Sequence, residues 1–170
     1  MLAGMVTALV LADTHLRPGR PGRLPDAVYR ALEGADVVLH AGDIVTADLL
    51  HELSGWAPVH AVLGNNDHDP ALSALPERRL EVIAGVRVAM VHDSGPAAGR
   101  AGRLRRWFPD AGVVVFGHSH IPMDEEGVDG QVLFNPGSPT QRRAQPHHTY
   151  GILELDDGVA RRRILPVPST

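Results

Sequence analysis

Five short apolar runs lie in the first 120 residues of the chain, and polar side chains able to bind a metal ion or a phosphate follow each of them directly. The runs cover residues 5–11, 36–39, 59–63, 86–91 and 113–116, and their β-branched character predicts buried strands. The polar groups after them are Asp13-Thr14-His15, Gly42-Asp43, Gly64-Asn65-Asn66-Asp67, His92-Asp93 and Gly117-His118-Ser119-His120. Because ligand sites of open α/β sheets lie beyond the carboxyl ends of the strands, we expect these five loops to meet at one place.

Helices are predicted over residues 25–33, 47–54 and 99–108, where Pro or Gly marks an end of each apolar pattern. Further strands are predicted over residues 131–134, 149–155 and 159–165, the last two joined by a tight turn at 156–158. This order favours an α/β first half completed by an antiparallel second sheet, with the helices outside two packed sheets. A length of 170 residues suits one domain over residues 1–170.

Composition excludes several other classes of protein. The chain has no cysteine, so a thiolate zinc site and a thiol nucleophile are ruled out, and a reducing, cytoplasmic location is expected. No apolar stretch approaches the roughly 20 residues that cross a bilayer, so no membrane partner is expected. A net charge of −4 argues against binding long nucleic acid, and the arginine clusters at 103–106 and 161–163 are interpreted as solvated surface.

The donor atoms of the five loops are imidazole nitrogens and carboxylate or amide oxygens, without sulfur. This set suits divalent Mn, Fe, Co, Ni or Zn, and so many donors require two ions. With Asp13 and Asp43 as the carboxylates, two divalent ions leave a formal charge of about +2 that attracts anions. Two metals can lower the pKa of a bridging water and clamp the oxygens of a phosphate ester, so the hydroxide serves as the nucleophile.

At these motifs the sequence resembles the calcineurin-like metallophosphoesterase superfamily, and most closely its small single-domain bacterial and archaeal phosphodiesterase branch, over residues 6–155. The resemblance implies a four-layer αββα sandwich of two mixed β-sheets flanked by helices. It implies two divalent ions, Mn first among them. One ion would be held by Asp13, His15 and His120, the other by Asn65, His92 and His118, with Asp43 bridging them. Residues 135–138, Asn-Pro-Gly-Ser, resemble a turn with a structural role.

The chain departs from the family pattern at Asn66, where larger relatives carry a His that assists the leaving group or binds phosphate. Asn66 is expected to act in catalysis by hydrogen bonding only, and to bind substrate together with Asn65 and His118. Asp93 could orient a ligand or be an exposed loop carboxylate, and His68 could replace the missing acid. The other histidines, which are His40, His51, His60, His147 and His148, are expected to be structural or exposed.

The function expected from these observations is a dinuclear metal-dependent phosphoesterase, acting on small phosphodiesters or nucleotides. Its specificity is expected to come from pocket walls at residues 16–22, 68–75 and a loop at 123–130. The alternative is a non-catalytic protein-binding scaffold of the same fold, similar to a retromer subunit; the complete set of seven ligand positions favours an enzyme. The oligomeric state stays open between a monomer and a homo-oligomer.

Overall fold

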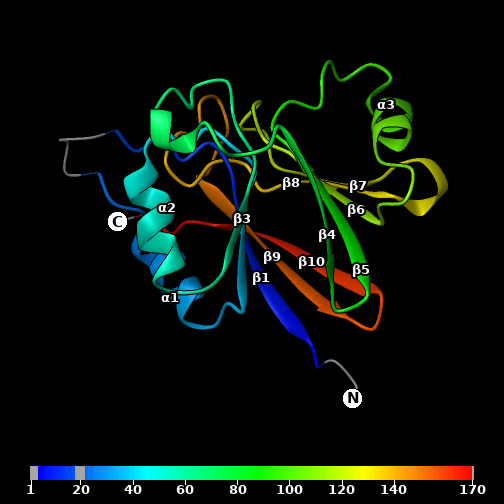
Figure 1. Cartoon of the computed structure of the whole chain (residues 1–170), viewed down its shortest axis with the longest axis horizontal. Coiled ribbons are helices and arrows are strands. Elements are labelled where there is room, and N and C mark those ends of the chain that lie inside the picture. The colour runs from blue at the N-terminus through cyan, green and yellow to red at the C-terminus, as the bar shows by residue number, and fades with distance from the viewer. Residues whose placement is uncertain (1–3, 18–21, 170) are drawn as a thin grey trace.

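Two five-stranded β-sheets form the centre of the protein, as shown by a computed structural model that describes residues 4–17 and 22–169. The strand order is β10-β9-β1-β2-β3 in the first sheet and β4-β5-β6-β8-β7 in the second (Figure 1). The first-sheet strands are β1 (Val6–Leu11), β2 (Val37–His40), β3 (Val59–Ala61), β9 (Thr149–Asp156) and β10 (Val159–Pro166). The second-sheet strands are β4 (Arg78–Ile83), β5 (Val86–Val91), β6 (Val113–Val115), β7 (Met123–Glu126) and β8 (Val132–Asn135).

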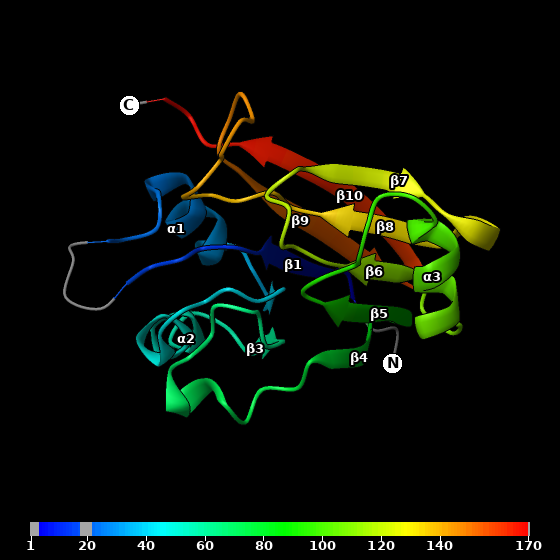
Figure 2. The same cartoon turned by 90° about the horizontal axis from the view of Figure 1, so that it is seen from above.

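In the part of the chain that the structure describes, three α-helices cover the outer faces of the two sheets, and Figure 2 shows α1 and α2 on one side of the molecule and α3 on the other. They are α1 (Asp26–Glu33), α2 (Ala47–Ser54) and α3 (Arg100–Trp107). Two short 3₁₀ helices, η1 (Pro70–Leu72) and η2 (Val128–Gly130), lie in loops. In the described part of the chain, no helix is long and apolar enough to cross a bilayer.

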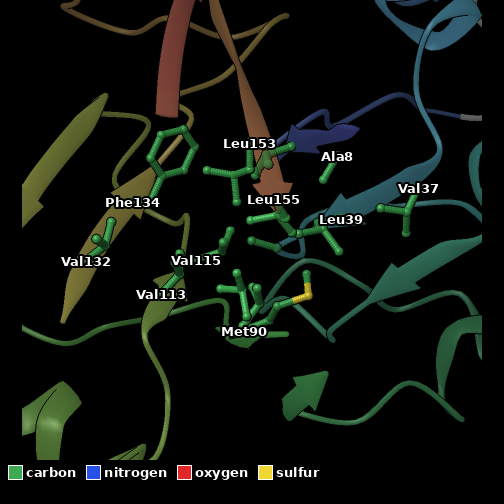
Figure 3. Packing of buried hydrophobic residues seen from close by; sticks show 14 of the residues in the cluster. Ala8, Val37, Leu39, Met90, Val113, Val115, Val132, Phe134, Leu153 and Leu155 are labelled. Carbon is green, nitrogen blue, oxygen red and sulfur yellow. The ribbon is translucent and has the colours of Figure 1, made fainter. Parts of the chain in front are cut away.

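Alternation of side chains along β1 explains the layers. Ala8 and Val10 point toward the second sheet and join the core between the sheets, whereas Leu9 and Leu11 pack under α1 and α2. Figure 3 shows part of the core between the sheets, where Leu153 and Leu155 of the first sheet lie near side chains of the second sheet. Leu104 and Phe108 cover the outer face of the second sheet. The expected αββα sandwich of two mixed sheets is confirmed.

Strand pairing departs from the sequence-based expectation in one respect. The hairpin of β9 and β10 does not build an antiparallel second sheet; β9 pairs antiparallel with β1 and extends the first sheet. The second sheet is parallel at its centre, through β5, β6 and β8, and antiparallel at both edges. The expectation was wrong because neighbours in sequence need not be neighbours in a sheet, and only long-range packing selects the partner.

Two edge strands escaped prediction. In β4 the even-numbered residues Arg78, Leu80 and Val82 are exposed, and β7 is Met-Asp-Glu-Glu, with three exposed carboxylates inside the segment expected to be a loop. Three of the six residues of β4 and three of the four residues of β7 are charged. Charges are common on edge strands because they discourage pairing with other chains, and here they hide the apolar pattern by which buried strands are recognised. Each of them pairs antiparallel with a mostly buried strand, β4 with β5 and β7 with β8, which supplies the hydrogen bonds.

Candidate metal centre

The five loops predicted to converge do meet at the carboxyl ends of β1, β2, β3, β5 and β6, although these strands belong to two sheets. One group of side chains there is Asp13, His15 and His120. The Nε2 atom of His120 lies 3.5 Å from Oδ1 of Asp13, and Nε2 of His15 lies 3.9 Å from the same oxygen. These atoms are close enough together to share a single ion.

A second group lies beside the first. Oδ1 of Asn65 is 2.9 Å from Nε2 of His92 and 3.1 Å from Nδ1 of His118, so this amide oxygen faces both imidazoles. Asp13 also reaches toward this group, because its Oδ1 lies 4.0 Å from Nε2 of His92. The sequence-predicted trio of Asn65, His92 and His118 is therefore brought together by the fold.

Asp43 lies between the two groups. Its Oδ2 is 3.3 Å from Nε2 of His15 and its Oδ1 is 3.4 Å from Nε2 of His92, so each carboxylate oxygen faces a different group. This is the arrangement that a carboxylate shared by two ions requires. All seven predicted ligand positions thus surround one small volume.

Several donor atoms of this cluster lack any hydrogen-bond partner among the described residues. They are Oδ2 of Asp13, Nε2 of His15 and Nε2 of His120, and all three are buried. Burying polar atoms without partners is costly, so such atoms indicate a place where an ion or a ligand can bind. Imidazole nitrogens and carboxylate oxygens are suitable donors for divalent transition metals, so the residues present fit a metal centre.

Backbone carbonyls orient two of the imidazoles. Nδ1 of His92 donates to the carbonyl of Ala41 (2.7 Å), and Nδ1 of His120 donates to the carbonyl of Gln141 (2.5 Å). Because Nδ1 of each ring is engaged in this bond, Nε2 is the nitrogen that faces the cluster and that the neutral ring can offer to an ion. Histidines that bind metals are commonly oriented in this way.

The backbone around the cluster adopts an uncommon conformation. Asp13, His15, Asp43, His118 and His120 have φ values of 55°, 45°, 57°, 69° and 60°, in the left-handed region. Non-glycine residues adopt this region at a cost in free energy, and such residues concentrate at functional sites. Five of the seven predicted ligands share this strain, which supports their role in function.

Asp67 fastens two of the loops together. Its Oδ2 accepts hydrogen bonds from the backbone N–H groups of Gly64 (2.7 Å) and Asp43 (3.1 Å), and its Oδ1 accepts from Val45 (2.7 Å). The sequence shows Asp67 as the last residue of the Gly-Asn-Asn-Asp motif but does not assign it this role. The only sign of this role in the sequence is that Asp67 lies two residues after Asn65 in a polar loop.

The Asn-Pro-Gly-Ser turn has the expected structural role, because its side chains donate hydrogen bonds to the loops that carry the cluster. The Asn135 amide donates to the carbonyl of Gly117 (3.1 Å), and the Ser138 hydroxyl donates to the carbonyl of Asp13 (2.8 Å). Thr140, which sequence reasoning did not identify, donates to the carbonyl of Thr14 (2.6 Å). The turn therefore holds two of the ligand-bearing loops at fixed positions.

His40 is a structural residue that reaches the site. It is fully buried, accepts from the backbone N–H of Gly42 (3.2 Å) and donates from Nε2 to the Thr14 hydroxyl (3.0 Å). Burial lowers the pKa of His40 to about 3, so the ring is neutral at physiological pH. His51 and His147 are exposed, and His60 lies 3.4 Å from a carboxylate oxygen of Glu81.

Asn66 is tied to Asp43 in this structure. Its backbone N–H donates to Oδ1 of Asp43 (2.9 Å) and its side-chain amide donates to Oδ2 (2.8 Å).

The exposed carboxylate of Asp93 lies 4.0 Å from Nε2 of His118 and accepts from the backbone N–H of Gly95 (2.7 Å). His68 is exposed, and its backbone N–H donates to the carbonyl of Asn66 (3.1 Å).

The two carboxyl groups differ in electrostatic environment. Burial raises the pKa of Asp13 to about 7, even though the neighbouring His92 opposes this shift. Burial also opposes ionisation of Asp43, but hydrogen bonds from His92 and Asn66 outweigh it and hold the pKa of Asp43 below its usual value. Burial lowers the pKa of His15 and of His120, so both are neutral and able to bind a metal near neutral pH.

We expect the affinity for a divalent ion to rise with pH between 6 and 8. Below a pKa of about 7 the carboxyl group of Asp13 carries a proton that the ion must displace, so the affinity should fall about tenfold for each pH unit below 7. Calorimetric titration with Mn²⁺ at constant ionic strength would measure this dependence. An affinity that stays constant from pH 6 to pH 8 would show that Asp13 is already ionised or does not bind the ion.

Arg143 is a cation near the cluster that sequence reasoning missed. Burial is the main cause of the pKa shifts of Asp13, His15 and His120, and the positive charge of Arg143 adds a lowering effect at each of them. Its backbone is left-handed, with φ of 51°. Only its place five residues after Ser138 of the Asn-Pro-Gly-Ser turn could have identified it.

Comparison with known proteins gives one consistent family. Residues 6–158 match the calcineurin-like phosphoesterase superfamily domain. A probable metallophosphoesterase of Methanothermobacter thermautotrophicus is 38% identical over 136 residues, covering 79% of this chain and 77% of that protein. A second, from Methanocaldococcus jannaschii, is 33% identical over 170 residues, covering 98% and 84%.

A solved structure shares the fold at lower identity. Vacuolar protein sorting 29 from Cryptosporidium parvum aligns with a TM-score of 0.76 and 19% identity, covering 95% of this chain and 97% of that one. At this identity the similarity establishes the fold alone.

Proposed function

Because the chain belongs to the calcineurin-like phosphoesterase superfamily, we propose that it is a phosphodiesterase that holds two divalent metal ions and hydrolyses small phosphodiesters or nucleotides. The observation that carries this proposal is the convergence of seven donor residues, three of which present buried atoms without partners. In the proposal, Asp13, His15 and His120 hold one ion, Asn65, His92 and His118 hold the other, and Asp43 bridges them. Mn²⁺ is the first candidate, ahead of Fe, Ni, Co and Zn.

Two such ions would supply the nucleophile by lowering the pKa of water and would bind the oxygens of the ester. The chain's own residues keep this apparatus in place. Asn66 fixes the orientation of Asp43 through two hydrogen bonds, which is the catalytic contribution we assign to it. Asn65, Asn66 and His118 are exposed, whereas Asp13 and Asp43 are buried, so the former three are assigned to contact with the substrate phosphate.

A singly charged diester suits the charge of the centre. Two divalent ions with two carboxylates carry a formal charge of about +2, which a nucleophilic hydroxide and a diester monoanion together neutralise. With a monoester dianion in place of the diester, the occupied centre would carry a net negative charge. Asn66 cannot protonate a leaving group at neutral pH, which favours esters whose leaving group needs little assistance.

Arg143 is proposed to attract the anionic substrate, so Arg143→Ala should raise the KM for bis(p-nitrophenyl) phosphate about tenfold and change kcat little. The reason is that a cation beside the site attracts the phosphate equally in the ground state and the transition state. Steady-state kinetics would measure both constants.

Arg142→Ala is the matched control, because the Arg142 guanidinium donates to the carbonyl of Gln145 (2.6 Å) and should not serve the substrate. Equal effects of the two substitutions would contradict a specific role for Arg143.

The experiment that tests the proposed function begins with removal of bound metal by a chelator. Mn²⁺, Co²⁺, Ni²⁺ or Zn²⁺ is then added back, and hydrolysis of bis(p-nitrophenyl) phosphate is compared with hydrolysis of p-nitrophenyl phosphate. Turnover that returns with the metal and is faster on the diester is the expected result. Faster turnover of the monoester would assign a phosphatase instead.

A non-catalytic scaffold is the second candidate, favoured by the structural similarity to vacuolar protein sorting 29. The complete set of donor residues supports the enzyme over the scaffold. A folded protein that shows no turnover with any of the four metals would favour the scaffold.

A cytoplasmic location is also part of the proposed function, and the absence of cysteine supports it.

A further inference from the structure

A pocket of about 310 Å³ opens beside the metal centre, on the side of Asn65 and His92. The rest of its wall comes from Leu63, Gly64, Glu77, Arg78, Val91, Asp93 and Trp107. None of these residues belongs to the segments from which sequence reasoning expected specificity. Because Asn65 and His92 line both the pocket and the metal centre, one arm of an ester bound at the centre can enter the pocket.

Arg78 is held on an aromatic face at the wall of this pocket. Its guanidinium carbon lies 4.1 Å from the centroid of the Trp107 ring and 5.8 Å from that of Phe108. Strand register explains its position, because Arg78 lies opposite Val91, the residue before His92. Among the described residues, no carboxylate lies within salt-bridge distance of Arg78, so its planar group is not neutralised by an ion pair.

The charges of the pocket select the kind of group that it can bind. Arg78 supplies one positive charge, and Glu77 and Asp93 supply two negative charges, so a second phosphate would be repelled. A flat ring can stack on the guanidinium, and amino groups on that ring can donate to the carboxylates. The volume lies at the lower end of the range for small-molecule pockets, which suits one ring system.

We propose that this pocket is a binding site for the nucleobase of a nucleotide-type substrate whose phosphate lies at the metal centre, with Arg78 on Trp107 as the stacking platform. This inference rests on the proposed function and narrows its substrate class from small phosphodiesters in general to those with a planar, amino-bearing ring in one arm.

The test uses a Trp56→Phe background, in which Trp107 is the sole tryptophan of the chain. Metal-loaded protein is titrated with AMP and with ribose 5-phosphate, and affinity is measured by calorimetry and by Trp107 fluorescence. AMP should bind about tenfold more tightly, because stacking of a base typically contributes that much, and should change the fluorescence. Ribose 5-phosphate should leave the fluorescence unchanged.

Arg78→Ala should reduce the affinity for AMP to that for ribose 5-phosphate, and Glu77→Gln should weaken binding of AMP more than binding of IMP, which lacks the amino group. Arg87→Ala is the matched control, because Arg87 is exposed near the opposite end of neighbouring strand β5. Arg87→Ala should preserve the preference for AMP.

Failure of this inference can be separated from failure of the proposed function. Inorganic phosphate binding and metal-restored hydrolysis are measured on the same preparation, and adenosine is titrated into the metal-free protein as a probe of the pocket alone. Equal affinities for AMP and ribose 5-phosphate, with phosphate binding and hydrolysis intact, would overturn the nucleobase site. Adenosine that changes Trp107 fluorescence, while ribose does not, would support it even without turnover.

Discussion

Asp43→Ala should lower metal-restored hydrolysis of bis(p-nitrophenyl) phosphate by about 10³-fold or more. Each oxygen of this carboxylate faces a different group of donors, at 3.3 Å from His15 and 3.4 Å from His92. If Asp43 bridges two ions as proposed, its removal would deprive both of a shared ligand and leave Asp13 as the remaining carboxylate of the predicted set. The rate is measured after chelation and addition of Mn²⁺, with bound metal counted by elemental analysis.

The control for this prediction is Asp110→Ala, which removes an exposed carboxylate just beyond α3. It should hydrolyse the diester at nearly the wild-type rate. Circular dichroism of both variants establishes that each is folded. Asp43→Ala protein that binds two ions and keeps a rate within tenfold of wild type would refute the assignment of Asp43 as the bridging ligand.

Gly64→Ala is the second change from which we expect a large effect, a loss of about 3 kcal/mol in the free energy of unfolding together with loss of metal binding. A Cβ at this position would lie 2.1 Å from the backbone nitrogen of Asp43 and 2.4 Å from its Oδ1. Movement of the Asp43 side chain cannot relieve this clash, because the nearest atom belongs to the backbone. The loop that carries Asp43 must therefore shift.

Gly102→Ala provides the matched control. Gly102 lies inside α3, where an added Cβ would have Arg106 Nη1 as its nearest contact, at 3.7 Å. Alanine is the better helix former, so this substitution should stabilise the protein by about 0.5–1 kcal/mol. Urea unfolding of the metal-free proteins measures both changes. A Gly64→Ala protein as stable as wild type would mean that the two loops are looser than the structure indicates.

Local sequence patterns were sufficient to predict most elements and the convergence of the five polar loops. The runs that became β1, β2, β3, β5 and β6 are mostly apolar because most of their side chains are covered on both faces of the strands, and such a strand is recognisable from its own residues. The seven candidate ligands could be found for a related reason. Each lies in the loop that follows such a strand, and the loops at the carboxyl ends of the parallel strands of both sheets meet at one place.

Contacts between distant segments were decided by the tertiary structure alone. The pairing of β9 with β1, the clamp that Asp67 forms on the Asp43 loop, and the approach of Arg143 to His15 leave no periodic signal in the sequence. The same holds for the stacking of Arg78 on Trp107, which joins the start of β4 to the end of α3. The burial of a residue along a strand depends on its own polarity, whereas the identity of its partner depends on how the whole chain packs.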